Sequence, residues 1–265
     1  MRQKKSLGQV FIKDQNIIEK IIKTAAIDPK DNVIEVGCGD GWFSLAIAKK
    51  AKALHIIELD PRCIVQTQLR LKELSTISYE QVDILKDEFS SSPFDTFRVI
   101  ANIPYYLSAK FMQLLVKKRD QVESAYIMVQ DEFAKKCKAK PGMVDYTSLT
   151  VYTNFYYDLS YEFKVKRTCF RPIPKVDSAI IKLTPKKDIL DVDEDLFFTI
   201  VRTSFWARRK TLLNTLLKGP YLDCDPKIKE IAFFENDPEI RGEVLGIEEF
   251  YQLYNQIKGL ITIRK

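Results

Sequence analysis

The stretch "VIEVGCGDGWFS", residues 33–44, passes from an apolar run through three glycines into a second apolar segment. Residues 32–37 predict a buried strand, and residues from about 42 to 50 predict a helix. Glycine lets the backbone approach a ligand closely, and the first N–H groups of a helix have no partners within the helix. The stretch therefore predicts a strand–turn–helix unit that binds a ligand at its glycines. An ordinary tight turn without a ligand is the alternative.

Short apolar strands and helices alternate over the first two-thirds of the chain. The further strands of this region are predicted at 53–60, 77–83, 97–104 and 124–130, and the further helices at 13–26, 62–74 and 108–118. This alternation is typical of a parallel sheet with helices on both faces. A helical stretch at 146–156 follows. Two more strands, 161–167 and 177–185, are then joined by the proline-containing loop "TCFRPIPKV".

The composition changes at about Asp188, where "KKDILDVDED" has the character of an acidic linker and helix start. Beyond it, helices are predicted at 195–218, about 225–234 and 247–258. The predicted fold class is therefore α/β: a Rossmann-like sheet with helices on both faces, followed by a small all-helical C-terminal domain. We expect the two domains to be residues 1–185 and 186–265.

The composition also excludes several classes of protein. No apolar run among the 265 residues approaches the roughly 18 residues that a membrane span needs, and no secretory signal follows the basic start. The five cysteines are scattered without a CxxC pair, and His55 is the only histidine. We therefore expect a cytoplasmic protein with free thiols, without a metal site and without histidine-based catalysis.

The positive charge of the chain is unevenly distributed. The formal net charge is +6, and residues 1–185 contain 29 basic and 22 acidic residues, whereas residues 186–265 contain 13 and 14. The excess lies in short runs at 117–119, 135–140 and 164–167. One such run is usually a solvated face, but several on one domain favour a polyanionic partner.

Acidic residues end the second and third predicted strands. Glu58 lies 21 residues after Gly37, where a carboxylate can accept hydrogen bonds from ribose hydroxyls. Asp83 ends the next strand, where its carboxylate can accept from an adenine amine. The glycine spacing is GxGxG and not the GxGxxG that suits a dinucleotide. These features favour S-adenosyl-L-methionine over a nicotinamide cofactor.

The fourth predicted strand ends in "NIPY", residues 102–105. The exocyclic amine of adenine is a poor nucleophile because its lone pair is delocalised into the ring. The side-chain oxygen of Asn102 and the backbone carbonyl of Ile103 can accept its two hydrogens and stabilise the positive charge that develops during attack. Pro104 fixes the backbone, and Tyr105 offers a face to the base. The alternative is a strand followed by an X-Pro turn.

The chain resembles the ribosomal RNA adenine dimethyltransferase family over nearly its full length. The resemblance is carried by "SLGQVFIKD", "VIEVGCGDG", "IIELD", "QVDIL", "ANIPYYLS", "FRPIPKVDSAIIKL", "FWARRKTLLNTL" and "RGEVLGIEEFYQL". Within the family it is most similar to the KsgA type, which implies dimethylation of the N6 amines of two adjacent adenines near the 3′ end of small-subunit (16S) rRNA. The implied partner is rRNA, within a small-subunit assembly particle, and the implied state is a monomer.

The resemblance also implies site residues. The family's cofactor contacts fall on Val10, Ile12, Gly37, Gly39, Glu58, Asp83 and Asn102. Val10 is a departure, because the family normally has Asn there, so a backbone contact is the one expected to survive. The catalytic group is Asn102, Pro104, Tyr105 and Phe170. Phe170 matches an aromatic that can stack on the target base, with core packing as the alternative, and residues 206–210 begin a helical signature expected to dock RNA.

Three competing functions remain open from the sequence. The first is methylation of a large-subunit rRNA adenine, as in the relatives that confer macrolide resistance, toward which "GDGWFS" leans. The second is a non-catalytic RNA-binding factor in assembly or transcription on the same fold. The third, a small-molecule methyltransferase, is disfavoured by the basic first domain.

Overall fold

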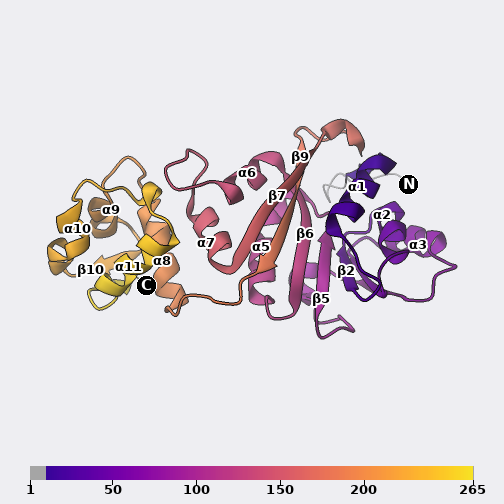
Figure 1. Ribbon diagram of the computed structural model, residues 1–265, viewed down its shortest axis with the longest axis horizontal. Coiled ribbons are helices and arrows are strands. Elements are labelled where there is room, and N and C mark those ends of the chain that lie inside the picture. The colour runs from indigo at the N-terminus through magenta and orange to yellow at the C-terminus, as the bar shows by residue number, and fades with distance from the viewer. Residues whose placement is uncertain (1–9, 265) are drawn as a thin grey trace. The chain divides into compact units, whose positions relative to one another are not determined.

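The computed structural model describes residues 10–264 (Figure 1). The chain divides into two compact units, one formed by residues up to 134 with 158–185 and the other by 135–157 with the residues from 186 onward. The division differs from the expected one at 185/186, because segment 135–157 belongs with the C-terminal unit. Four residues of the "SLGQVFIKD" stretch, 6–9, lie outside the described part of the chain.

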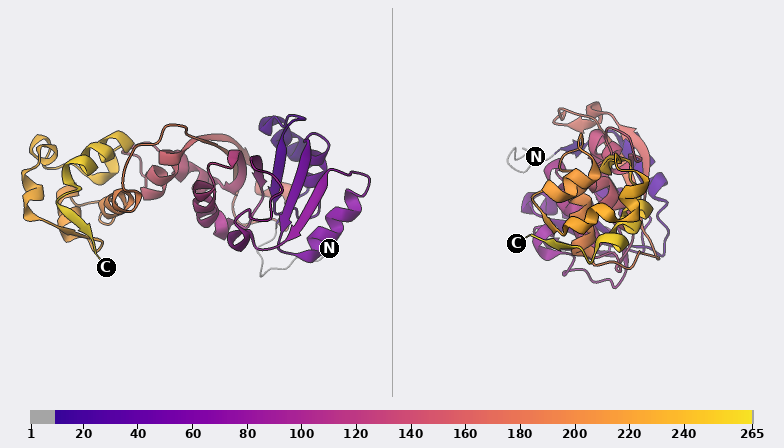
Figure 2. Two further views of the ribbon diagram at one scale, coloured as in Figure 1. Left: turned by 90° about the horizontal axis from the view of Figure 1, so that it is seen from below. Right: turned by 90° about the vertical axis from the view of Figure 1, so that its left-hand side faces the viewer.

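The first unit contains a seven-stranded sheet in the order β4-β3-β2-β5-β6-β9-β7, and Figure 2 shows the strands of its N-terminal part side by side. Its strands are β2 (Asn32–Val36), β3 (Ala53–Glu58), β4 (Ile77–Gln81), β5 (Phe97–Ala101), β6 (Val122–Gln130), β7 (Tyr157–Val165) and β9 (Ser178–Pro185). The strands from β4 to β6 are parallel, as predicted, whereas β9 runs antiparallel to β6. A separate antiparallel pair joins β1 (Phe11–Ile12) to β8 (Phe170–Arg171).

Helices cover both faces of this sheet. They are α1 (Gln15–Ala25), α2 (Trp42–Ala48), α3 (Pro61–Arg70), α4 (Ile84–Asp87) and α5 (Ser108–Lys117), with α6 (Asp131–Lys138) at the unit boundary. Along β5 the side chains alternate between faces. Arg98 donates hydrogen bonds to the carbonyls of Ala25 and Ala26 at the end of α1. Phe97 instead packs against Phe89, which contacts Phe111 of α5.

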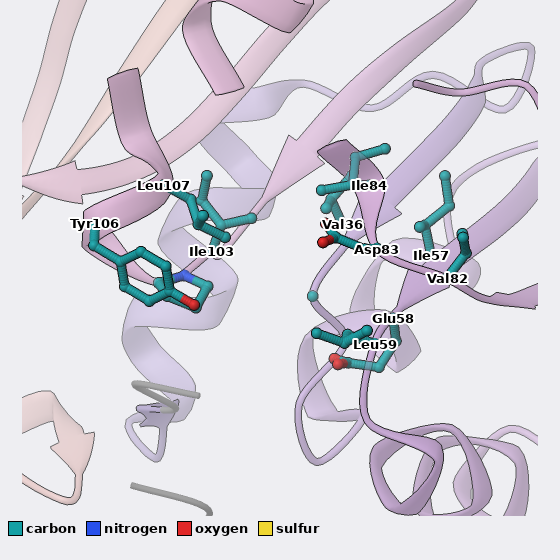
Figure 3. A pocket seen from close by; sticks show the side chains of 12 residues that line it. Val36, Ile57, Glu58, Leu59, Val82, Asp83, Ile84, Ile103, Tyr106 and Leu107 are labelled. Carbon is teal, nitrogen blue, oxygen red and sulfur yellow. The ribbon is translucent and has the colours of Figure 1, made fainter. Parts of the chain in front are cut away.

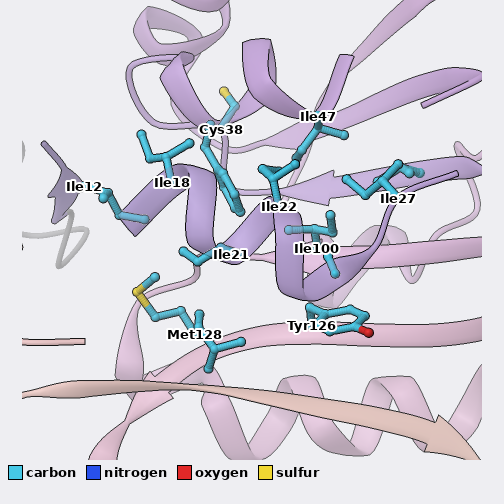
Figure 4. Packing of buried hydrophobic residues seen from close by; sticks show 14 of the residues in the cluster. Ile12, Ile18, Ile21, Ile22, Ile27, Cys38, Ile47, Ile100, Tyr126 and Met128 are labelled. Atoms are coloured by element: carbon cyan, nitrogen blue, oxygen red, sulfur yellow. The ribbon is translucent and has the colours of Figure 1, made fainter. Parts of the chain in front are cut away.

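The main core lies between α1 and the sheet. Ile18, Ile21 and Ile22 of α1 are buried at helical spacing, and Figure 4 shows Ile21 and Ile22 on the side of Met128 and Ile100 of the sheet, with Ile18 toward Cys38. Asp14 caps the helix by accepting from the Asn16 N–H at 3.0 Å. The predicted helix at 13–26 is thus confirmed within one or two residues at each end.

The second unit is mainly helical. It contains α7 (Ser148–Tyr156), α8 (Glu194–Ser204), α9 (Leu212–Lys218), α10 (Ala232–Asn236) and α11 (Ile247–Ile257). Segment 135–157 belongs here because rings of α7 pack on α8: the centroid of Phe155 lies 5.1 Å from that of Phe197 and 5.2 Å from that of Phe198.

Two expectations for this unit were wrong. The single helix predicted at 195–218 is broken: α8 ends at Ser204, and α9 begins at Leu212, where the Thr211 side chain caps it by accepting from the Asn214 N–H at 3.4 Å. The unit is also not purely helical, since β10 (Leu222–Cys224) pairs antiparallel with β11 (Ile261–Ile263). That pairing joins residues nearly 40 positions apart, which local periodicity does not reveal.

Short 3₁₀ turns complete the described elements, at Tyr105–Leu107, Arg167–Cys169, Pro226–Glu230 and Gly242–Val244. Among the described residues, no helix combines the length and apolar character needed to cross a membrane.

We predict that Ile21→Ala lowers the free energy of unfolding by about 2–5 kcal/mol, because Ile21 is 1% exposed at the contact between α1 and the sheet. Glu19→Ala, at an exposed position of the same helix, is the matched control and should change it by less than about 0.5 kcal/mol. Urea denaturation of both variants measures the difference. Equal stabilities would contradict this assignment of the core.

Candidate active site

Four neighbouring parallel strands end together at one edge of the sheet. Val36 of β2 pairs with Ile57 of β3 and with Ala101 of β5, and Glu58 pairs with Gln81 of β4. The residues that follow these pairs are therefore brought to one edge. The structure thus brings together four of the predicted site residues: Gly37, Glu58, Asp83 and Asn102. Ligands of open α/β sheets bind at this carboxyl edge.

The glycine turn fits closely against its neighbours. Gly37 has a φ of +83°, and a Cβ placed on it would lie 2.7 Å from the carbonyl oxygen of Asn102. Gly39 has a φ of +58°, and its Cβ would lie 2.9 Å from the Phe11 ring. A larger residue at either position would meet both strain and a clash. Glycine is required here by the fold, and the same absence of side chains leaves backbone exposed to a ligand.

Two adjoining hollows open along this edge and share Gly37, Glu58, Ile103 and Pro104. The first has a cavity volume of about 80 Å³ and is also lined by Asp83. Figure 3 shows Ile103, Tyr106 and Leu107 on one side of it and Glu58, Leu59 and Asp83 on the other. The second has a cavity volume of about 50 Å³ and is completed by Val10, Phe11, Gly39 and Asn102.

Backbone donors hold the Glu58 carboxylate in place. Its Oε1 accepts from the Asp60 N–H at 2.8 Å, and its Oε2 accepts from the Gly39 N–H at 3.4 Å. Burial raises the pKa of Glu58, while these two N–H groups counteract the rise. The carboxylate is thus oriented between the glycine turn and the hollows, as an acceptor for hydroxyl groups must be.

Asp83 and Asn102 are also fixed by their local structure. Asp83 caps α4, where its Oδ1 accepts from the Leu85 N–H at 3.0 Å. The Asn102 N–H donates to the Val36 carbonyl at 3.1 Å, which continues the β2–β5 ladder and leaves the side chain at the second hollow. Pro104 follows in extended conformation.

The remaining predicted site residues differ from these in their burial and in whether they line a hollow. Tyr105 is half-buried, and its hydroxyl lies 2.6 Å from the Ser178 Oγ of β9. Ile12 and Phe170 are paired across β1 and β8 and are 4% and 0% exposed within the core. The full burial of Phe170 supports the packing alternative over stacking on a base. Val10 does line the second hollow, although its side chain cannot make the contacts of the family Asn.

The sequence reasoning missed several lining residues. Leu59, Ile84, Tyr106 and Leu107 line the first hollow, and Phe11 lines the second. The two adjacent tyrosines at 105–106 could have pointed to Tyr106 as a lining residue, because a second aromatic residue directly after a strand end is unusual in an ordinary turn. Within residues 10–264, no group of three or more His, Cys, Asp or Glu side chains is arranged to hold a metal ion.

The family model described as ribosomal RNA adenine dimethylase matches residues 1–235. The chain belongs to this family. It is 38% identical over 263 residues to the ribosomal RNA small subunit methyltransferase A of Clostridium botulinum, covering 97% of this chain and 94% of the relative. It is 35% identical over 266 residues to the enzyme of the same name from Streptococcus pyogenes, covering 96% and 92%.

Solved structures agree with the family assignment. A dimethyladenosine transferase from Plasmodium falciparum matches with a TM-score of 0.78 and 27% identity, over 95% of this chain and 99% of that one. The 23S rRNA methyltransferase ErmE matches with a TM-score of 0.72 and 25% identity, over 94% and 99%. The predicted methyltransferase fold is therefore confirmed.

This family member also buries a second carboxyl group beneath the glycine turn. Glu35 of β2 is 0% exposed, and neither of its carboxylate oxygens has a hydrogen-bonding partner in the protein. Burial raises its pKa to about 8, with the nearby Glu58 carboxylate adding to the rise. The Ser44 hydroxyl opposes it, although the two side chains do not meet hydrogen-bond geometry. Glu35 is thus mainly uncharged at neutral pH.

We predict that Glu35 makes the stability of this protein fall as pH rises. Its folded pKa, about 8, lies above the ordinary 4.5, so its stabilising contribution is complete below about pH 4.5 and is lost as pH rises to about 8. The Glu35→Gln variant keeps the shape without the ionisation. We expect the unfolding free energy of the variant minus that of the wild type to increase by on the order of 4 kcal/mol when the pH is raised from about 5 to about 8.

Urea denaturation at several pH values measures this difference. Glu19→Gln, at an exposed position, is the control for removing one carboxylate. Parallel stability curves for Glu35→Gln and the wild type would show that Glu35 is ionised in the folded protein.

Proposed function

We propose that this protein is an S-adenosyl-L-methionine-dependent rRNA adenine N6-methyltransferase that dimethylates two adjacent adenines near the 3′ end of small-subunit rRNA. The observation that carries the proposal is the convergence of Gly37, Glu58, Asp83 and Asn102 at four adjacent strand ends around two connected hollows. The small-subunit assignment rests on the relatives named ribosomal RNA small subunit methyltransferase A.

The residues present fit this cofactor. The first hollow has apolar walls and the carboxyl groups of Glu58 and Asp83, which suit a base, its amine and a ribose. The second hollow, with Gly39 and the half-buried Asn102, suits the short polar methionyl part. Gly37 lies where they join, and it has no side chain to block the passage. When bound, the cofactor supplies an already activated methyl group on a sulfonium.

The protein's contribution to the chemistry is positioning and charge stabilisation. The Asn102 side-chain oxygen and the Ile103 carbonyl accept the two hydrogens of the adenine amine. This favours a pyramidal nitrogen whose lone pair is free to attack the methyl group. Pro104, with a φ of −54° and a ψ of 134°, keeps these two acceptors in a fixed relation. No metal and no histidine are required for this mechanism.

The target adenine has to leave its stack to reach this position, and an aromatic face replaces the lost stacking. Tyr105 is proposed as that face, because the contact of its hydroxyl with Ser178 Oγ fixes the ring next to Pro104. Phe170 contributes from the core, where it lies opposite Ile12 in the β1–β8 pair next to Phe11 and Val10.

The rRNA is expected to bind through phosphate contacts of the basic runs. Segment 206–210 contributes Arg209 and Lys210, both exposed, whereas Arg208 is engaged with Glu243. Recognition within a small-subunit assembly particle, a monomeric state and a cytoplasmic location belong to the same proposal.

A large-subunit adenine is the second candidate substrate, favoured by the match to ErmE over 94% of the chain. Incubation of both ribosomal RNAs, and of small-subunit particles, with methyl-labelled cofactor separates the two candidates. We expect label on two adjacent adenines of small-subunit rRNA. Label confined to the large-subunit RNA would overturn the assignment, and absence of any label would favour a non-catalytic binding factor.

We predict that Asn102→Ala lowers the single-turnover methylation rate by about 10²–10³-fold at saturating cofactor and RNA, because the amide acts on charge that develops in the transition state. RNA affinity and thermal stability should stay close to those of the wild type, and cofactor affinity is measured in parallel. Asn255→Ala, at an exposed position of α11 in the second unit, is the matched control. Near-normal turnover of Asn102→Ala would remove it from the catalytic group.

A further inference from the structure

An exposed tryptophan follows the glycine turn that bounds the second hollow. Trp42 is the first residue of α2, and its exposed fraction is 38%. In the turn before it, Gly39 lines the second hollow together with Asn102. The Trp42 ring itself lines neither the first nor the second hollow. A large aromatic side chain therefore lies beside the proposed site without forming part of it.

Helix α3 fixes the surroundings of this ring. Gly41 has a φ of +80°, and a Cβ on it would lie 2.9 Å from the Thr67 Oγ1 of α3. The missing side chain lets α3 pack on the turn, and Arg70 follows Thr67 by about one helical turn. Arg70 Nε donates to the Asp40 carbonyl at 3.0 Å, and the guanidinium carbon lies 3.6 Å from the centroid of the Trp42 ring. One face of the ring is thus covered by a guanidinium in a fixed position.

The other face of the ring is the one available to a partner. Arg70 is half-buried and hydrogen-bonded to the backbone, whereas Trp42 is exposed, so Arg70 lies on the protein side of the pair. A cation against an aromatic face holds the ring in place without burying it. The pair therefore presents a flat apolar surface to a partner.

The charge beside the ring favours an anionic partner. Lys13 forms an ion pair with Asp40, so the carboxylate of this turn is already compensated. Among the described residues, no carboxylate forms an ion pair with Arg70, whose side chain contacts a carbonyl and a ring. The domain around it is basic, because residues 1–185 contain 29 basic and 22 acidic residues. A nucleotide combines a flat base with a phosphate and so matches both features.

An apolar protein segment is the competing partner. Val65 and Leu69 of the same helix α3 are 55% and 64% exposed and offer aliphatic surface to such a segment. A contact of that kind gains nothing from a guanidinium held against an aromatic ring. The cation and the basic domain therefore favour RNA.

We propose that Trp42, supported by Arg70, is a stacking platform for an unpaired base of the RNA substrate. This inference rests on the proposed function, in which the target adenine leaves its stack and reaches Asn102. Trp42 comes three residues after Gly39, which lines the same hollow as Asn102. Flipping one base also deprives its neighbours in the strand of stacking, and an aromatic face restores it. The platform holds the strand beside the target adenine.

Binding of a 3′-end fragment of small-subunit rRNA tests the platform. Trp42→Ala should weaken this binding by roughly 10- to 100-fold, which is the loss expected for one stacked base. The slope of log affinity against log salt concentration should stay that of the wild type, because no phosphate contact is removed. Trp42→Phe keeps an aromatic face and should lose less than Trp42→Ala. Arg70→Lys keeps the charge but removes the planar support, and it should also weaken binding.

Leu69→Ala is the matched control, because Leu69 is exposed on the same helix and its loss removes apolar surface without touching the platform. It should bind the fragment as the wild type does. Each variant should also bind S-adenosylhomocysteine as the wild type does, since Trp42 lines neither hollow. Thermal melting confirms that the fold is kept.

Tryptophan fluorescence provides a measurement that leaves Trp42 in place. Trp42 and Trp206 are the only tryptophans of the chain, so the emission of Trp206→Phe comes from Trp42 alone. A base stacked on an indole quenches its emission. The rRNA fragment at saturation should therefore quench Trp42, whereas a fully paired RNA duplex of the same length should not, because its bases are already stacked.

The outcomes separate this platform from the proposed function. Unchanged RNA affinity of Trp42→Ala, or an absence of quenching at saturating fragment, would overturn the platform. An equal loss in Leu69→Ala would indicate a general apolar surface of the kind that binds proteins, and would overturn it too. A wild type that binds the fragment but transfers no methyl group would overturn the proposed function alone. A wild type that binds no RNA would overturn both.

Discussion

The close approach of Gly37 to the carbonyl of Asn102 is the contact on which the site depends. A Cβ on Gly37 would lie 2.7 Å from that oxygen, so the turn after β2 and the end of β5 stay adjacent only with glycine. The parallel pairing of β2 with β3 and β5 brings Glu58 to the same edge. One steric requirement thereby places the proposed cofactor pocket beside the residues proposed to hold the target amine.

The electrostatics of this edge follow from burial. Glu58 is partly desolvated but receives two backbone N–H groups, so it is oriented as an acceptor. Glu35, directly behind the turn, receives none and has a pKa raised to about 8. Two carboxyl groups near one turn are tolerated because one of them is mainly protonated near neutral pH. Glu58 and Asp83 are the carboxyl groups that line the first hollow.

The fold could be predicted largely from local patterns. Alternating apolar strands and helices indicated the sheet, and the strand ends Gly37, Glu58, Asp83 and Asn102 indicated where a ligand would lie. The assignment of segment 135–157 could not be predicted, because its helix α7 is held by rings of α8 that come more than 40 residues later. The pairing of β10 with β11 could not be predicted for the same reason, since it depends on contacts between residues distant in the sequence.

The sequence by itself determined the family, the parallel sheet and the chemical groups of the proposed site, because glycine spacing and strand-end residues are local properties of the chain. Only the tertiary structure decided which aromatic side chains are exposed and which are buried. Tyr105, Tyr106 and Phe170 have similar hydrophobicity, yet a hydroxyl contact holds the first, a 3₁₀ turn exposes the second and the β1–β8 pair buries the third. The exposure of a side chain depends on which other residues pack over it. Those residues are often distant in the sequence, so local sequence patterns do not reveal them.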